Sequence, residues 1–235
     1  MAIRIRCGAV TFGWGPFAGA ALQLVLLALV WKVDGLGLAG WLSGSAYAIA
    51  LCGLLLVALR GTRLGPADVV TLTRATLVGC VTALVADTVT RPAPTTTLVA
   101  LASIALALDA VDGQVARRTG TASPLGARFD MEVDAFLILV LSVFVARSLG
   151  PWVLAIGAMR YVFVAVSWFL PWLKAPLPPS MGRKTVAAVQ GVVLVVAAAD
   201  VLPQTFAMLV TGLALTSLCW SFGRDVTWLA RHRAG

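Results

Sequence analysis

The sequence predicts an all-α integral membrane protein with about eight transmembrane helices. Of its 235 residues, 60% are hydrophobic and only 12% are charged, whereas soluble domains carry roughly 25% charged residues. The mean hydropathy is +0.96, and apolar stretches long enough to cross a bilayer recur along the whole chain. These stretches leave little of the chain for a domain outside the membrane.

Eight apolar stretches set the order of the predicted helices. Two N-terminal helices are predicted within residues 1–60, and a basic interfacial connector rich in helix breakers follows at residues 61–67. A six-helix core is predicted at residues 68–230, and a basic tail at residues 231–235. The eight predicted spans cover residues 17–33, 38–59, 68–89, 97–117, 125–146, 152–173, 185–201 and 205–229.

Caps and breakers separate the stretches. The apolar run near the N-terminus is too long for that of a signal peptide, which predicts a retained first span. Pro66 marks the boundary before the third span, and Asp68 is placed to cap the N-terminus of that helix. Proline, glycine or basic residues fill the later connections, which predicts turns at 91–94, 118–124, 147–151, 174–184 and 200–203.

Positive charge is distributed unevenly between the two sides of the predicted bundle. Fourteen of the 18 Lys and Arg residues lie at or near the termini, the connector and the loops at 118–124 and 174–184, which share one side. The opposite turns carry Lys32, Arg91 and Arg147. Since cytoplasmic loops are enriched in Lys and Arg, we expect a multi-pass protein of the cell membrane with both termini in the cytoplasm.

The composition disfavours two classes of function. The sequence has no basic run with interleaved aromatic residues, so we expect no nucleic-acid partner. Its only histidine is His232, and its 4 cysteines lack C-x2-C spacing. Both observations argue against a zinc site.

A cluster of aspartates interrupts the apolar pattern. Carboxylates are costly in hydrocarbon, so four of them at helical spacing mark a candidate functional site. Residues three or four apart share a helix face, and a short polar connection joins the two predicted helices, so we expect all four carboxylates to meet in one shallow pocket at the cytoplasmic surface. The full pattern is D-x2-D-G-x2-A-R-x8-G-x3-D-x3-D, formed by Asp109, Asp112, Gly113, Ala116, Arg117, Gly126, Asp130 and Asp134.

These residue types favour metal and phosphate chemistry. Oxygen ligands without His or Cys favour Mg²⁺, Mn²⁺ or Ca²⁺, and a cation would relieve the repulsion among the carboxylates. Gly113, Ala116 and Gly126 leave room for a phosphate, and Arg117 is placed to bind its charge. One carboxylate could then activate an acceptor hydroxyl group. The alternative is that the aspartates are exposed caps and ion-pair partners at helix ends, which would account for one or two of them.

In residue and spacing, the eight positions resemble the complete signature of the CDP-alcohol phosphotransferase family, and the similarity extends over about residues 66–229. The resemblance implies a membrane enzyme of phospholipid synthesis with six core helices, to which the two N-terminal spans are an addition. Such an enzyme transfers a phosphatidyl (substituted phosphoryl) group from a CDP-alcohol, such as CDP-diacylglycerol, to the hydroxyl group of a polar alcohol and releases cytidine monophosphate (CMP). The resemblance also implies a homodimer.

The resemblance implies roles for individual residues. Two divalent ions, Mg²⁺ or Mn²⁺, would be held by Asp109, Asp112, Asp130 and Asp134, and Asp134 would be the general base. The CDP pocket would be lined by Gly113, Ala116, Arg117 and Gly126. Upstream, Asp68, Thr71 and Arg74 resemble the family's N-x-x-T-x-x-R segment, in which Asp68 replaces the usual Asn and would, with Thr71, contact the nucleotide.

Five basic residues are candidates for binding the acceptor or a phosphate: Arg74, Arg128, Arg160, Arg183 and Lys184. The last three resemble basic positions of phosphatidylinositol-phosphate and phosphatidylglycerophosphate synthases, the nearest subgroup, which favours a phosphorylated acceptor. In the alternative interpretation, Arg160 makes a structural ion pair, and Arg183 and Lys184 are ordinary cytoplasmic loop charges. The same chemistry with a neutral acceptor or a non-lipid CDP-alcohol donor is also an alternative.

A membrane transporter with an acidic ion site on the cytoplasmic side is the alternative from a different class. It would predict an inverted repeat or helices broken in mid-membrane. No repeat is visible in the sequence, and the acidic cluster lies at one predicted membrane face. The enzyme is therefore the favoured interpretation.

Overall fold

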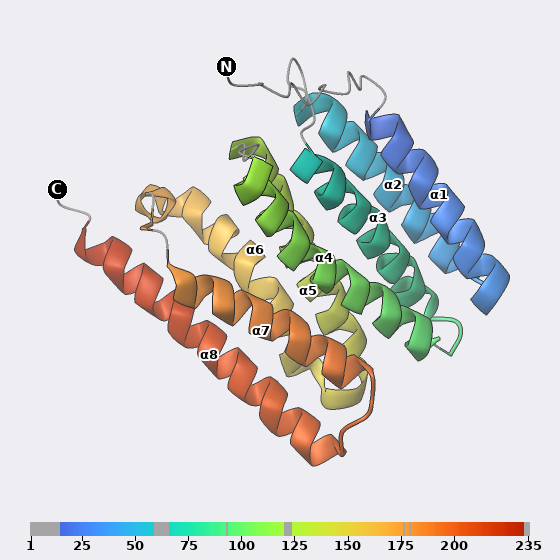
Figure 1. Ribbon diagram of the computed structural model, residues 1–235. Helices are drawn as coiled ribbons and strands as arrows, with labels where there is room; N and C mark the ends of the chain where they lie inside the picture. The colour runs from blue at the N-terminus through green and yellow to red at the C-terminus, as the bar shows by residue number, and fades with distance from the viewer. Residues whose placement is uncertain are drawn as a thin grey trace, which may run out of the picture. The chain divides into compact units, whose positions relative to one another are not determined.

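The computed structural model describes residues 15–58, 66–92, 94–119, 124–175, 177–178 and 180–232, with residues 58, 66–67, 110–119 and 124–125 described by their backbone alone. These ranges contain eight α-helices, two short 3₁₀ helices and no strand (Figure 1). The α-helices are α1 (Gly15–Asp34), α2 (Leu38–Ala58), α3 (Pro66–Asp87), α4 (Thr95–Thr119), α5 (Pro124–Leu149), α6 (Leu154–Phe169), α7 (Met181–Ala198) and α8 (Gln204–Arg231). The 3₁₀ helices η1 (Pro151–Val153) and η2 (Pro171–Lys174) flank α6.

Most of the described helices have the length and composition of membrane spans. Six stretches are long and apolar enough to cross a bilayer: Gly15–Asp34, Leu38–Val57, Asp68–Asp87, Pro151–Phe169, Met181–Ala198 and Gln204–Arg231. α4 adds a shorter apolar stretch, Thr95–Asp109, and α5 carries Asp130, Glu132, Asp134 and Arg147 within an apolar sequence. The predicted all-α, multi-pass membrane fold is confirmed.

The sixth predicted span, residues 152–173, is not one continuous α-helix. It consists of η1, α6 and η2. Pro151 and Pro171 begin the two 3₁₀ helices, because the fixed φ and missing N–H of proline suit a first helical turn. Gly150, with a φ of 106°, follows the end of α5 and donates its N–H to the Ala146 carbonyl at 3.0 Å. These residues shorten α6 at both ends.

α7 begins inside the segment that the sequence predicts as a loop, residues 174–184. Its first residue is Met181, so Arg183 and Lys184 lie in the first helical turn. Positive side chains are unfavourable there because the helix macrodipole is also positive at the N-terminus. Asp225 of α8 compensates Arg183, with Nη1 and Oδ2 lying 3.4 Å apart.

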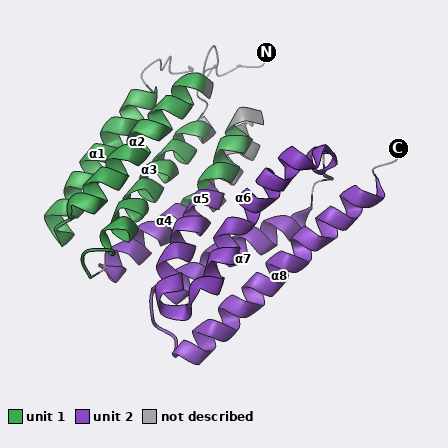
Figure 2. Ribbon diagram, turned by 180° about the vertical axis from the view of Figure 1, so that it is seen from behind, with its two compact units in different colours: residues 1–92, 107–133 green, residues 93–106, 134–235 purple. Residues whose placement is uncertain are grey.

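The chain forms two compact units, residues 1–92 with 107–133 and residues 93–106 with 134–235 (Figure 2). α4 and α5 each contribute residues to both units. In the first unit α1, α2 and α3 pack against one another. In the second, α7 packs against α8, which also contacts α6.

Glycines bring the helices of the first unit close together. A Cβ atom added at Gly40 of α2 would lie 3.0 Å from the carbonyl oxygen of Ala83 on α3. One added at Gly44 would lie 2.8 Å from Cδ2 of Leu27 on α1. Leu27 and Ala83 are both fully buried. Small residues of this kind allow membrane helices to pack by close backbone approach, where lipid and protein are equally apolar.

Asp87, the last residue of α3, caps the N-terminus of α2. Its Oδ2 accepts a hydrogen bond from the Gly37 N–H at 2.9 Å, and its Oδ1 accepts one from the Gly40 N–H at 3.4 Å. Arg91, which follows α3, donates to the carbonyl of Gly35, which follows α1. This hydrogen bond joins the C-terminal ends of α1 and α3. Because Asp87 is buried, its carboxylate satisfies backbone donors that would otherwise lack a partner.

We expect Asp87→Ala to lower the free energy of unfolding by about 1–2 kcal/mol, because backbone donors at the start of α2 lose their acceptor. Thermal unfolding of the purified protein in detergent micelles would measure the loss. Asp200→Asn is the control, since Asp200 is exposed with a φ of 52°, a conformation that Asn tolerates. Equal losses in the two variants would contradict the capping role.

Candidate metal centre

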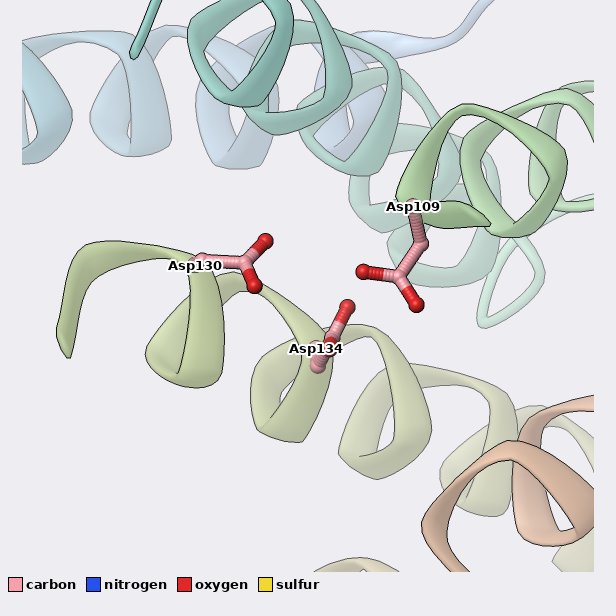
Figure 3. Close-up of side chains that lie close together, drawn as sticks. All are labelled: Asp109, Asp130 and Asp134. Atoms are coloured by element: carbon pink, nitrogen blue, oxygen red, sulfur yellow. The ribbon is translucent and has the colours of Figure 1, made fainter. Parts of the chain in front are cut away.

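Three aspartates of the predicted cluster converge in the structure. Asp109 extends from α4, while Asp130 and Asp134 extend from α5 one turn apart. Figure 3 shows the three carboxylates pointing toward one another. One oxygen atom of each lies within 4.8 Å of the others, and all three residues are half-buried. Since α5 is continuous, the helix itself keeps Asp130 and Asp134 on one face.

A buried arginine holds two of these carboxylates. The side chain of Arg74 on α3 is only 1% exposed, and its Nη1 lies 3.0 Å from Oδ1 of Asp109. The same Nη1 donates to Oδ1 of Asp130. The two aspartate side chains are 39% and 30% exposed. A buried charge without a partner is strongly unfavourable, so these ion pairs tie α3 to the aspartates of α4 and α5.

The donor set fits a divalent cation. Carboxylates this close repel one another unless a cation lies among them. Three carboxylates and one guanidinium leave two negative charges, which one divalent ion would balance. Oxygen ligands alone favour Mg²⁺ or Mn²⁺ over zinc. The fourth predicted ligand, Asp112, lies on α4, and its side chain is outside the described residues.

The predicted nucleotide residues lie on the helices that carry Arg74 and the aspartates. Thr71 is buried near the start of α3, where it shares a face with Arg74 three residues later. Asp68 in the first turn of α3 and Gly126 near the start of α5 are half-buried. Three further residues lie on α4, with side chains outside the described residues: Gly113, Ala116 and Arg117.

The remaining predicted acceptor residues lie on α5, α6 and α7. Arg128 is exposed on α5, and Arg160 is half-buried on α6. On α7, Arg183 is half-buried and Lys184 is exposed. Of these four, Arg183 lines a described cavity.

This cavity has a volume of about 250 Å³ and lies where the segment before α7 meets α8. Its polar lining consists of Ser180, Arg183, Arg224 and Asp225, and Trp228 forms part of its wall. Arg224 donates to Oγ of Ser180 at 3.4 Å. Two arginines against one aspartate leave the lining with a net positive charge, which suits an anionic ligand.

Two features of these sites are not evident from the sequence. The sequence pattern predicts Arg74 as an acceptor ligand, whereas in the structure it contacts Asp109 and Asp130. The pattern does not predict Arg224 and Asp225 as residues that line a cavity. The signal that could have found them is a pair of adjacent charges inside the last apolar span, where a charge needs a partner or water.

Comparison with known proteins agrees with the signature residues. A family model described as CDP-alcohol phosphatidyltransferase matches residues 65–220, which is more than half of the 235-residue chain. The matched range begins at α3 and contains all four signature aspartates. No curated protein and no solved structure matches the chain.

Replacing Arg74 with methionine, which is neutral and of similar length, should destabilise the metal-free protein by about 2 kcal/mol, because hydrogen bonds to charged groups are lost. We expect Mn²⁺ to raise the unfolding temperature of this variant more than that of the wild type. Without the guanidinium, the bound ion would be the cation that balances the negative charge of the carboxylates. Thermal unfolding in detergent, with and without Mn²⁺, measures both effects.

Arg128→Met is the matched control, because Arg128 is an exposed arginine on the acidic helix α5. It should change neither the stability nor the response to Mn²⁺. Equal stabilisation of the wild type and Arg74→Met by Mn²⁺ would contradict the role of Arg74 as a cation of this centre.

Proposed function

The chain belongs to the CDP-alcohol phosphatidyltransferase family, and on that premise we propose that it transfers the phosphatidyl group of CDP-diacylglycerol to a phosphorylated alcohol and releases CMP. Family membership makes the protein a transferase of substituted phosphate groups that acts on a CDP-alcohol and an alcohol in a membrane. The observation that carries the proposal is the convergence of the Asp109, Asp130 and Asp134 carboxylates.

Two divalent ions, Mg²⁺ or Mn²⁺, are assigned to the four signature aspartates Asp109, Asp112, Asp130 and Asp134. Three of these offer carboxylate oxygens within 4.8 Å of one another, which supports the assignment. When bound, such ions neutralise the negative charge of a diphosphate and orient it for displacement. Arg74 adds a fixed, buried positive charge at the same carboxylates.

The nucleotide half of the donor is assigned to residues beside the metal centre. Small residues on α4 and α5 leave room for the diphosphate to approach the helices, and Arg117 would bind its oxygens. On α3, the carboxylate of Asp68 and the hydroxyl group of Thr71 offer polar contacts for the sugar or the base. The full set is Asp68, Thr71, Gly113, Ala116, Arg117 and Gly126.

Asp134 is assigned as the general base. A carboxylate oxygen of Asp134 would accept the proton of the acceptor hydroxyl group as the hydroxyl oxygen attacks the phosphorus atom that carries the diacylglycerol. A new P–O bond forms to the acceptor while the P–O bond to CMP breaks, and CMP leaves with the bridging oxygen and its electron pair. Because Asp134 is half-buried, its proton can then be returned to solvent.

The acceptor is proposed to be phosphorylated, such as glycerol phosphate or inositol phosphate. Arg128, Arg160, Arg183 and Lys184 are assigned to its recognition, since guanidinium and ammonium groups bind phosphate oxygens. The net positive lining of the cavity beside Arg183 supports this choice. The fifth candidate, Arg74, is already engaged by Asp109 and Asp130.

The proposed catalytic core spans residues 68–230. It follows two added helices within residues 1–60 and a connector at 61–67, of which residues 61–65 lie outside the described residues, and it precedes a basic tail at 231–235. The uneven distribution of Lys and Arg supports an orientation in the cell membrane with the metal centre and both termini in the cytoplasm. Resemblance to the family supports a homodimer.

The test is CMP release by the purified protein with Mg²⁺ or Mn²⁺. CDP-diacylglycerol is supplied with glycerol phosphate, inositol phosphate, glycerol or inositol, and CDP-glycerol replaces it in a parallel series. We expect release with CDP-diacylglycerol and a phosphorylated acceptor, and its loss with a chelator. Release with neutral acceptors alone would exclude the proposed acceptor, and release with CDP-glycerol alone would exclude the proposed donor. No release with any pair would contradict the enzymatic assignment.

Asp134→Asn should reduce the rate of CMP release by at least about 10²-fold, because amide nitrogen and oxygen cannot take up the acceptor's proton. The melting temperature of the metal-free variant should remain close to that of the wild type. Glu132→Gln is the control, since Glu132 is exposed and about 200° around α5 from Asp134. Full activity of Asp134→Asn would exclude it as the base.

Arg183→Gln and, separately, Arg224→Gln should raise KM for the phosphorylated acceptor by about tenfold or more, because each loses charge-assisted hydrogen bonds. The KM for CDP-diacylglycerol should not change. Lys174→Gln removes an exposed positive charge from η2 and serves as the control for general electrostatic attraction. If the KM for the acceptor is unchanged in both arginine variants, the cavity does not bind the acceptor.

A further inference from the structure

Helix α1 contacts α3 on both sides of Arg74. A Cβ atom added at Gly19 of α1 would lie 2.8 Å from Cδ1 of Leu72, two residues before Arg74. One turn further along α1, Gln23 reaches the α3 backbone at Thr76, two residues after Arg74. Gly19 and Gln23 share one face of α1, and Leu72 and Thr76 share one face of α3. The residues of α3 that contact α1 therefore lie on both sides of Arg74 in the sequence.

Gln23 is the polar centre of this contact. It is fully buried in the apolar middle of α1. In the amide orientation that satisfies both of its groups, its nitrogen donates to the Thr76 carbonyl at 2.6 Å and its oxygen accepts from the Cys80 N–H at 3.3 Å. Thr76 and Cys80 are four residues apart, so the amide spans the two ends of one helical turn. Gln23 thus binds the backbone of α3 directly.

Gly79 provides the space for this amide. A Cβ atom added at Gly79 would lie 2.4 Å from the side-chain amide of Gln23 and 2.6 Å from the ring of Tyr47 on α2. Cβ atoms do not lie this close to other atoms, so a side chain at position 79 would displace the Gln23 amide and the Tyr47 ring. α1 and α2 therefore both pack against the same turn of α3.

Arg74 projects from α3 on the side away from this contact. Successive residues of a helix are about 100° apart, which puts Arg74 about 200° from both Leu72 and Thr76. One side of α3 is therefore fixed by α1, while the opposite side carries Arg74 to Asp109 and Asp130. Because Arg74 is buried, its guanidinium follows the position of the helix.

We propose that Gln23 is a positioning residue for the metal centre: by fixing the Thr76–Cys80 turn of α3, it sets where Arg74 holds Asp109 and Asp130. The inference rests on the proposed metal centre. It gives a role in that centre to α1, which lies outside the range matched by the family model.

A displaced Arg74 keeps its charge but loses its alignment. Charge-assisted hydrogen bonds depend on distance and angle, so a shifted α3 would let Asp109 and Asp130 separate before an ion binds. The ion would then have to bring the carboxylates together while the positive charge of Arg74 still opposes it, which lowers its affinity. Removing the guanidinium altogether also removes that opposing charge, so Arg74→Met does not have the same effect. This loss depends on the presence of Arg74, because the change at Gln23 reaches the carboxylates through that guanidinium.

The experiment measures Mn²⁺ binding to the detergent-purified protein from the electron paramagnetic resonance signal of free Mn²⁺, without nucleotide. Gln23→Met keeps the size and flexibility of the side chain but removes both hydrogen-bonding groups. We expect it to weaken Mn²⁺ binding several-fold. In an Arg74→Met background the same change should leave Mn²⁺ binding unaltered, and this non-additivity would show that the effect passes through Arg74.

Two further variants complete the experiment. Gly79→Ala displaces the Gln23 amide without removing it and should weaken Mn²⁺ binding in the same way, so it decides the question if Gln23→Met does not fold. Gln190→Met is the matched control, because Gln190 is buried and donates to the Ala214 carbonyl at 2.8 Å in the second unit. It should leave Mn²⁺ binding unchanged.

Unchanged or tighter Mn²⁺ binding by Gln23→Met overturns the inference and leaves the proposed function intact. The same holds if the loss persists in the Arg74→Met background, or if Gln190→Met weakens binding equally, since the effect would then be general loss of packing. Failure of the wild type to bind Mn²⁺ overturns both this inference and the proposed metal centre.

Discussion

The ion pairs of the buried Arg74 guanidinium with Asp109 and Asp130 are the interactions on which the candidate metal centre depends. Three carboxylates within 4.8 Å of one another would separate if they were left uncompensated. Arg74 offsets part of that repulsion from a fixed, buried position on α3, and the negative charge that remains suits a divalent ion. The same ion pairs join α3 to the two helices that carry the signature aspartates.

The N-terminal helices extend this arrangement through polar contacts and close backbone packing. Lipid and helix surfaces are equally apolar, so burial alone does not select one packing of membrane helices. Asp87 selects one by capping α2, and Gln23 does so by bonding to the backbone of α3. Glycines at the contacts allow the helices to approach closely enough for these bonds. α1 and α2 therefore pack in one defined arrangement against α3, the helix that carries Arg74.

Local sequence was sufficient to predict most of the helices and the grouping of the aspartates. Length and hydropathy decide whether a stretch can span a bilayer, and most helices lie within a few residues of their predicted bounds. The i, i+4 spacing of Asp130 and Asp134 likewise decides that they share a face. The predicted spans at 152–173 and 185–201 are present, but their ends differ. Pro151 and Pro171 begin 3₁₀ turns on either side of α6, and α7 begins before Arg183.

By itself, the sequence determined the membrane fold, the family and the identity of the signature residues, because hydropathy and spacing are properties of neighbouring residues. Only the tertiary structure decided what Arg74 and Gln23 contact. Their partners lie 35 or more residues away for Arg74 and about 50 or more for Gln23, and a buried polar group can be satisfied by any partner that packing brings within reach. The choice among such partners is made by how the helices pack, which no local pattern records.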